Sequence, residues 1–270
     1  MPDIGLDAIK IDYASIADAK AMTGLRLVLG NYAVPGPWRE ACKGIFHVKG
    51  ISYTPVVAAS LDGNDQELKE WTSQSSAPVA VWNDEPPRSK WFEQLQLAER
   101  LGPNPSLIPS GIDDRMLMFG YCNEICGENG YAWSKRLMMI DSVLQNPATD
   151  EGTKAFWTGF GEKYGYSAEA AAAAPARMAA VVESLAKRLE QQKETGSKFL
   201  VGNKLSGLDI YWATFAALIK PLPEDLCPMA TGFRAFYNTD EPAVLNVLTP
   251  ELLEHRDFVY ENYLELPIVF

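Results

Sequence analysis

Residues 199–210 read FLVGNKLSGLDI, from Phe199 to Ile210, and lead into the apolar segment YWATFAAL at 211–218. Ser206 is followed three residues later by Asp209, which is the pattern of a capping box at a helix start. The serine hydroxyl accepts from the Asp209 amide, while the Asp209 carboxylate accepts from the Ser206 amide. The stretch therefore predicts a buried helix over about 207–219.

The composition excludes several classes of protein. The chain has 270 residues, of which 47% are apolar and 22% charged, with a net charge of −11. A charge of this sign argues against a nonspecific binder of nucleic acid or of an anionic membrane, because both need basic surface. No run approaches the roughly 20 apolar residues of a membrane span, and the start Met1-Pro2-Asp3 does not resemble a signal peptide. We therefore expect a cytoplasmic protein.

Four cysteines are present, at 42, 122, 126 and 227. They are too few and too scattered for a disulfide scaffold. Cys122 and Cys126 share one face of a helical pattern, but the chain has only two histidines to join them in a metal site. We expect buried structural thiols and no metal.

The first hundred residues alternate strand and helix patterns. Residues 1–22 have no strong period and are expected to be an extension that packs on the first domain. Strands are expected at 25–29, 51–57 and 78–82, a helix at 37–49 closed by Gly50, and a second helix at 89–101. The polar segment 63–71 has room for a helical turn.

The second half reads as helical. The proline-rich residues 103–106 read as a linker. Beyond them, helices are expected at about 112–146, 150–164, 167–195 and 207–219, with a late one near 249–256. The glycines within the 112–146 pattern indicate close packing or a bend.

The phrase FLVGxxLSxxDI resembles the buried capping box of the glutathione transferase superfamily, and the order of elements is similar to the architecture of that family. The resemblance implies an α/β thioredoxin-like domain at 23–102, the linker 103–106 and an all-α helical-bundle domain at 107–270, and covers most of the chain. It also implies glutathione as co-substrate, a small hydrophobic electrophile as second substrate, and a homodimer.

The resemblance implies a residue that activates the glutathione thiol at the end of the first strand. Several classes have a tyrosine there, 18 residues ahead of the glycine that closes the first helix, and Tyr32 has this spacing from Gly50. Classes with cysteine or serine place it a few positions later, where this chain has neither. Tyr32 is the candidate and Asn31 the reserve. The alternative that Tyr32 only packs under its loop stays open.

Further positions are implied to hold the tripeptide. Trp38 lies at the start of the first helix, and Ala77-Pro78 stands where the fold has a cis-proline that exposes the preceding backbone to the ligand. A proline at the first residue of a strand has a second explanation, because no ladder donor is lost there. Ser89 matches the serine that binds the γ-glutamyl carboxylate, but Arg88 replaces the usual acid or amide. Arg88 has two possible partners, the ligand carboxylate and its own neighbours Asp84 and Glu85.

Two functions follow from the resemblance. The first is a glutathione transferase that activates the thiol for attack on an apolar electrophile. The alternative is a non-catalytic protein of the same fold that binds hydrophobic ligands or a protein partner, which the departure at Arg88 favours. Aromatic residues at 38, 91, 131 and 133 are candidates to line an apolar cleft, although most are expected in the core.

Overall fold

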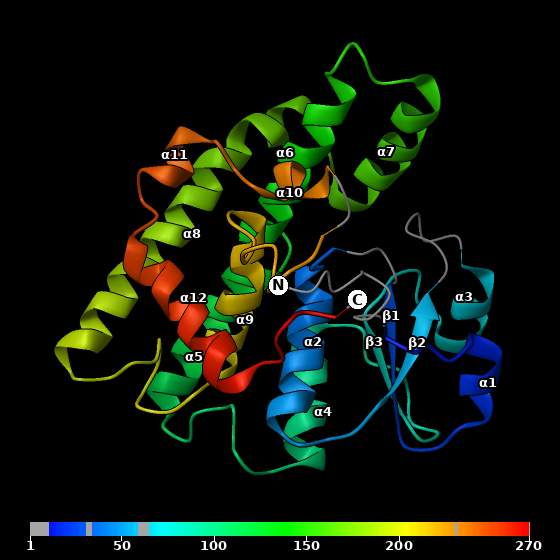
Figure 1. The fold of residues 1–270 in the computed structure, drawn as a ribbon, viewed down its shortest axis with the longest axis vertical. Helices are drawn as coiled ribbons and strands as arrows, with labels where there is room; N and C mark the ends of the chain where they lie inside the picture. The colour runs from blue at the N-terminus through cyan, green and yellow to red at the C-terminus, as the bar shows by residue number, and fades with distance from the viewer. Residues whose placement is uncertain (1–10, 31–33, 59–64, 230–231, 270) are drawn as a thin grey trace. The chain divides into compact units, whose positions relative to one another are not determined.

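The chain forms two compact units in a computed structural model that describes residues 11–30, 34–58, 65–229 and 232–269 (Figure 1). The first unit takes in the described residues up to Leu107, together with 221–234 and the residues from 259 onward. The second comprises 108–220 and 235–258. Two C-terminal segments that we expected in the helical domain therefore belong with the first unit.

The first unit is built on a small mixed sheet. Its strands are β1 (Leu25–Gly30), β2 (Thr54–Ala58) and β3 (Val79–Trp82), and its helices are α1 (Ile16–Ala21), α2 (Pro37–Val48), α3 (Gln66–Thr72) and α4 (Trp91–Leu101).

The strand order β2-β1-β3 follows from a βαβ unit and a third strand. β1 is parallel to β2, as the crossover through α2 requires, and antiparallel to β3, with Val28 opposite Val79. Helix α1 was not predicted. Residue Ala14, just ahead of it, forms a parallel bridge with Val56, so this part of the N-terminal segment lies at the edge of the sheet.

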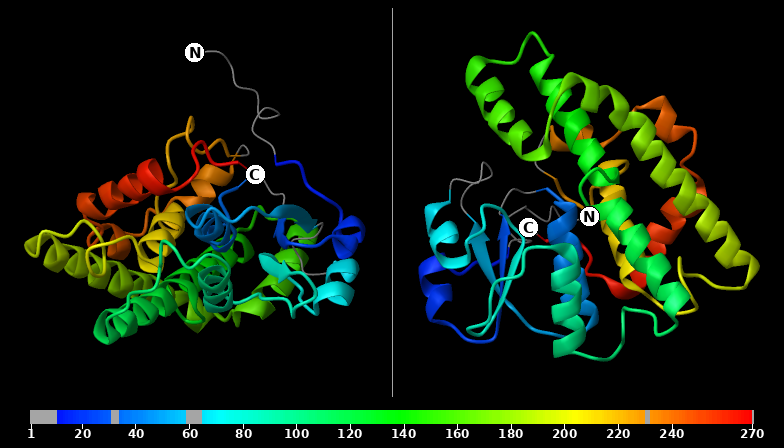
Figure 2. Two further views of the ribbon diagram at one scale, coloured as in Figure 1. Left: turned by 90° about the horizontal axis from the view of Figure 1, so that it is seen from below. Right: turned by 180° about the vertical axis from the view of Figure 1, so that it is seen from behind.

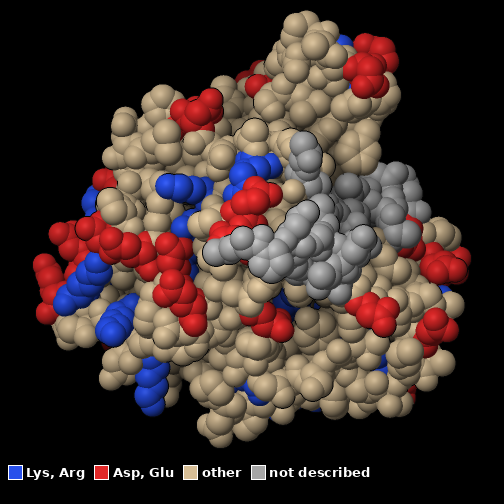
Figure 3. Space-filling model, viewed as in Figure 1, with Lys and Arg blue, Asp and Glu red and all other residues tan. Residues whose placement is uncertain are grey.

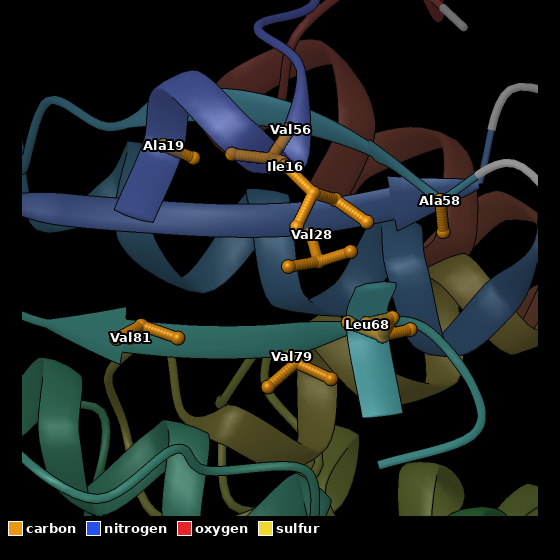
Figure 4. Close-up of a cluster of buried hydrophobic side chains, with 8 residues drawn as sticks. All are labelled: Ile16, Ala19, Val28, Val56, Ala58, Leu68, Val79 and Val81. Carbon is orange, nitrogen blue, oxygen red and sulfur yellow. The ribbon is translucent and has the colours of Figure 1, made fainter. Parts of the chain in front are cut away.

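Helices cover both faces of this sheet. Figure 4 shows one apolar layer, in which Ile16 of α1 and Leu68 of α3 pack with Val28, Val56 and Val79 of the three strands. Helices α2 and α4 pack against each other on the opposite face, as the right-hand view of Figure 2 shows. Side chains alternate between the two layers because successive residues of a strand point to opposite faces.

The second unit is helical. Its main helices are α5 (Ile112–Cys126), α6 (Tyr131–Leu144), α7 (Glu151–Tyr164), α8 (Ala168–Glu194) and α9 (Gly207–Phe215), followed by the 3₁₀ turn η2 (Ala216–Leu218) and α11 (Pro242–Leu245). Helices α10 (Phe233–Tyr237) and α12 (Pro250–Tyr263) run across the boundary between the units. Helix α6 packs against α7 and α8, and α5 packs against α9.

The predicted capping box begins α9. The Asp209 carboxylate is fully buried and accepts from the Ser206 amide at 2.8 Å, the Ser206 hydroxyl at 2.7 Å and the Leu200 amide at 2.8 Å. The His255 ring contacts the same carboxylate, with Nε2 3.0 Å from Oδ1. The prediction from 199–210 is confirmed, and the carboxylate joins three separate parts of the second unit.

The single helix expected at 112–146 is wrong, because α5 and α6 are separate. The break lies at 127–130, where two glycines are sterically required. A Cβ at Gly127 would lie 2.6 Å from the Asn123 side chain, and one at Gly130 would lie 2.5 Å from the Glu124 carbonyl oxygen. Asn129 between them has a left-handed φ of 59°. Any larger residue at these two positions would collide with the last turn of α5.

Charged side chains of both signs share the surface of the second unit. Figure 3 shows acidic and basic side chains interspersed over α8 and α12. A cavity of about 720 Å³ lies between α8 and residues 246–251, and its lining carries glutamates and lysines together. Within the described ranges, no helix combines the length and the apolar character needed to cross a bilayer.

Candidate functional site

The end of β1 and the start of β3 lie side by side in the first unit. The antiparallel register runs from Leu25 opposite Trp82 to Val28 opposite Val79. The chain that follows Gly30 leads to α2, whose first residue is Pro37 and whose N-cap, Gly36, has no side chain to satisfy the helix amides. The sheet thus places Val79, the first residue of β3, beside Val28, near the end of β1.

Asn31 and Tyr32 fall outside the described residues, so their predicted roles stay predictions. Trp38 lies in the first turn of α2 and is half-buried.

The Ala77–Pro78 bond is cis, as predicted, and directly precedes β3. Pro78 is buried, and its carbonyl oxygen accepts from Gln94 Nε2 at 3.1 Å. The same Gln94 nitrogen lies 3.3 Å from the Arg88 carbonyl oxygen. Gln94 on α4 therefore ties together two of the segments that the sequence assigned to the ligand.

Arg88 is paired with its own neighbours. Its guanidinium donates to Glu85 at 2.6 Å and to the Pro86 carbonyl at 2.9 Å. Arg100 binds the same Glu85 carboxylate, and the two guanidiniums, Arg100 more than Arg88, hold the pKa of Glu85 below its usual value. The main chain of Arg88 forms an antiparallel bridge with Ala80. Of the two partners considered for Arg88, the structure shows the neighbouring acid.

The N-terminus of α4 is capped from within its own first turn. The Glu93 carboxylate accepts from the Ser89 amide at 3.2 Å and from the Lys90 amide at 3.1 Å. Both amides lie at the helix start, where a bound anion would compete with this carboxylate. Ala77 and Pro78 directly precede β3, and Arg88 bridges to Ala80 within it, while the Ser89 amide next to Arg88 already has a protein carboxylate as its partner.

Comparison with solved structures shows which fold this is. A glutathione S-transferase from Xanthobacter autotrophicus Py2 has a TM-score of 0.55 and 15% identity, with 90% of this chain and 96% of that chain covered. One from Methylobacterium radiotolerans, solved with glutathione sulfonate, has a TM-score of 0.52 and 18% identity, with 84% and 95% covered. The tau-class enzyme of mango, Mangifera indica, has a TM-score of 0.51 and 19% identity, with 87% and 98% covered.

This chain has the glutathione transferase fold. The predicted fold class, a thioredoxin-like domain with an all-helical domain, is confirmed. No protein-family model matches the sequence. No curated protein matches it either. At identities below 20%, the likeness concerns the fold.

The remaining candidates are the four aromatic residues, one of which is fully buried and three of which are half-buried. Tyr131 is fully buried and donates to the Phe215 carbonyl at 3.1 Å, and Trp133 donates to the Tyr164 carbonyl at 2.9 Å. Tyr131 is therefore a core residue of the second unit and Trp133 is half-buried against that core, while Trp38 and Trp91 are half-buried in the first unit.

All four cysteines are free and buried, as predicted, and burial raises the pKa of each thiol. They are therefore poor nucleophiles. In the described part of the chain, no group of three His, Cys, Asp or Glu side chains has the arrangement of a metal site.

The sequence analysis missed Glu93 and Gln94. A signal for Glu93 was available, because an acid three residues after the N-cap is half of a capping box. Gln94 had only a weak signal, a polar residue inside the apolar pattern of α4, where it is 3% exposed.

Proposed function

We propose that this chain binds glutathione along the start of β3 and that Tyr32 activates the thiol for attack on a small apolar electrophile. The observation that carries the proposal is the register that sets Val28, near the end of β1, against Val79, which directly follows the cis Ala77–Pro78 bond. In a chain with this fold, that placement fits a tripeptide whose backbone pairs with Ala77 and whose sulfur approaches the start of α2. The Methylobacterium structure with glutathione sulfonate supports the same ligand here.

The chemistry assigned to Tyr32 is stabilisation of a thiolate. A free thiol has a pKa near ~8.5, so only a few per cent is ionised at pH 7. A phenol that donates to sulfur favours the thiolate, and lowering the pKa by about two units would ionise most of it. The N-terminus of α2 adds about 0.3–1 kcal/mol in the same direction. Asn31 is the reserve donor.

Tyr32→Phe tests this assignment. We expect the variant to keep its affinity for glutathione and to lose roughly 25-fold in conjugation rate at pH 7, the ratio of thiolate fractions for a two-unit shift in pKa. The loss should shrink above pH 9, where the thiol ionises unaided. Calorimetry with glutathione and a rate assay with a dinitrophenyl halide measure the two quantities. An unchanged rate at pH 7 would remove Tyr32 from the mechanism and leave Asn31→Ala as the next variant.

A non-catalytic binding protein is the second candidate, and two contacts favour it. Arg88 is engaged by Glu85, and the amides of Ser89 and Lys90 are engaged by Glu93, so the Arg88 guanidinium and the Ser89 amide already have protein partners where a γ-glutamyl carboxylate was expected. Absence of a calorimetric signal with glutathione, together with retained binding of an apolar dye, would select this function over the enzyme.

The setting of the reaction is also part of the proposal. We place the protein in the cytoplasm, where free thiols such as its four cysteines persist and reduced glutathione is abundant. We propose that two copies assemble as a homodimer. Light scattering on the purified chain measures the mass, and a monomer would overturn the last point.

A further inference from the structure

A buried arginine joins both ends of the connection between β1 and α2. Arg39 lies in the first turn of α2 and is 5% exposed. Its Nη1 donates to the carbonyl of Gly30, the last residue of β1, and its Nη2 donates to the carbonyl of Val34. The residues between these two carbonyls are 31–33, which include Tyr32. One guanidinium thus fixes the described backbone on each side of the segment to which we assign thiol activation.

Arg39 shares a buried carboxylate with a second cation. Arg39 Nε donates to Glu40 Oε1 at 3.2 Å, and Lys43 Nζ donates to Glu40 Oε2 at 2.8 Å. All three side chains are at least 93% buried. Lys43 also donates to the Val269 carbonyl at 2.7 Å, and the Ile268 amide donates to the Leu226 carbonyl at 2.8 Å. The network therefore extends from the end of β1 to the C-terminal segment of the first unit.

This arrangement is specific to arginine. The guanidinium is a rigid planar fork whose nitrogens point in fixed, different directions, so it can bind two carbonyls and a carboxylate at once. A lysine has one compact donor group and cannot span both carbonyls. Burying ions is costly, and a buried ion pair is weak evidence for stability, so a role in fixing geometry explains its presence better.

We propose that Arg39 is a positioning residue for the proposed thiol site. It holds Gly30 and Val34 at a set separation, and the Glu40–Lys43 pair, anchored on Val269, holds Arg39. This inference rests on the proposed function for its catalytic consequence, but the positioning itself concerns only the protein. The two parts can therefore be tested separately.

The test compares Arg39→Met and Arg39→Lys with a matched control, Arg234→Met. Arg234 is in the same unit and also binds two carbonyls, those of Leu222 and Cys227, and one acid, Glu224. Arg39→Lys keeps the charge beside Glu40, so it provides a folded variant if Arg39→Met does not fold. Hydrogen–deuterium exchange of peptides over 29–36 reports on positioning, and the pH profile of kcat/KM for conjugation reports on the thiol.

We expect exchange over 29–36 to rise at least tenfold in both Arg39 variants and to stay at the wild-type rate in Arg234→Met. The pH profile of the Arg39 variants should shift upward by about one unit, with the lost rate recovered at high pH. Wild-type exchange in both Arg39 variants, or an equal rise in the control, would overturn the inference. If exchange rises but the pH profile does not move, Arg39 is structural and the positioning role fails. If the wild type binds no glutathione, the proposed function fails, and the exchange comparison still decides whether Arg39 holds the connection.

Discussion

At the scale of single residues, Lys135 gives the protein a measurable dependence on pH. Its side chain is buried in the second unit, and its ammonium donates to the Asn238 carbonyl at 2.9 Å. Its pKa is lowered to about 8, mainly by burial and to a smaller extent by the neighbouring Arg136. The carboxylate of Asp240 raises the pKa but does not offset these two effects. In the unfolded chain the pKa of a lysine is about 10.4, so the unfolded state binds the proton more tightly. Burying the charged Lys135 therefore lowers the free energy of unfolding. This destabilisation is complete below pH 8 and disappears as the pH rises from 8 to about 10.4.

Lys135→Met should therefore stabilise the protein at pH 7. The destabilisation is about 3 kcal/mol at most, and the lost hydrogen bond and the unpaired Asn238 carbonyl offset much of it, which leaves a gain of about 1 kcal/mol. The gain should fall between pH 8 and 10 and then reverse. Urea unfolding of the wild type and the variant across this pH range measures the difference between their free energies of unfolding. Cysteines and tyrosines titrate in both proteins, so their contributions cancel in this difference. A difference that is constant from pH 7 to 10 would contradict the assignment.

At the scale of elements, the capping of α4 sets how well a ligand carboxylate can bind. Glu93 occupies the Ser89 and Lys90 amides with a full negative charge. Glu93→Gln keeps an acceptor and removes the charge, so glutathione affinity should rise about two- to fivefold, the effect of about 0.3–1 kcal/mol at a helix N-terminus. Calorimetry measures it. Glu67→Gln, in the first turn of α3, is the matched control and should leave the affinity for glutathione unchanged. Weaker binding in Glu93→Gln would show that the ligand carboxylate does not lie there.

The elements that local signals specify were predictable. The capping box of α9, the strand, helix and strand pattern around α2, and the proline at the start of β3 depend on residues close together in the sequence. The break between α5 and α6 was only hinted at, because the steric need for Gly127 and Gly130 depends on how the chain turns after α5. At the site, the cis Ala77–Pro78 bond was predicted correctly, whereas Arg39 gave no signal. Its two carbonyl partners become neighbours only when the chain folds around it.

At the scale of the whole molecule, the first unit is discontinuous in sequence. Residues up to 107 are joined in this unit by 221–234 and by 259–269. In the last segment, the Val269 carbonyl accepts from Lys43 and the Ile268 amide donates to the Leu226 carbonyl. A fragment of residues 1–107 should therefore lack a cooperative thermal transition at the temperature of the full chain. Circular dichroism measures this. Adding a peptide of residues 259–270 should restore part of the stability, and a scrambled peptide should not. A fragment that melts like the intact protein would contradict this account.

The same connectivity governs the order of events during synthesis. Domains generally fold in the order in which they leave the ribosome, N-terminal first. Here the buried Lys43 meets its carbonyl partner only after residue 269 has emerged, later than the whole of the helical unit. Lys43 of the nascent α2 must therefore wait for residue 269 to be translated before it has its full set of hydrogen-bond partners.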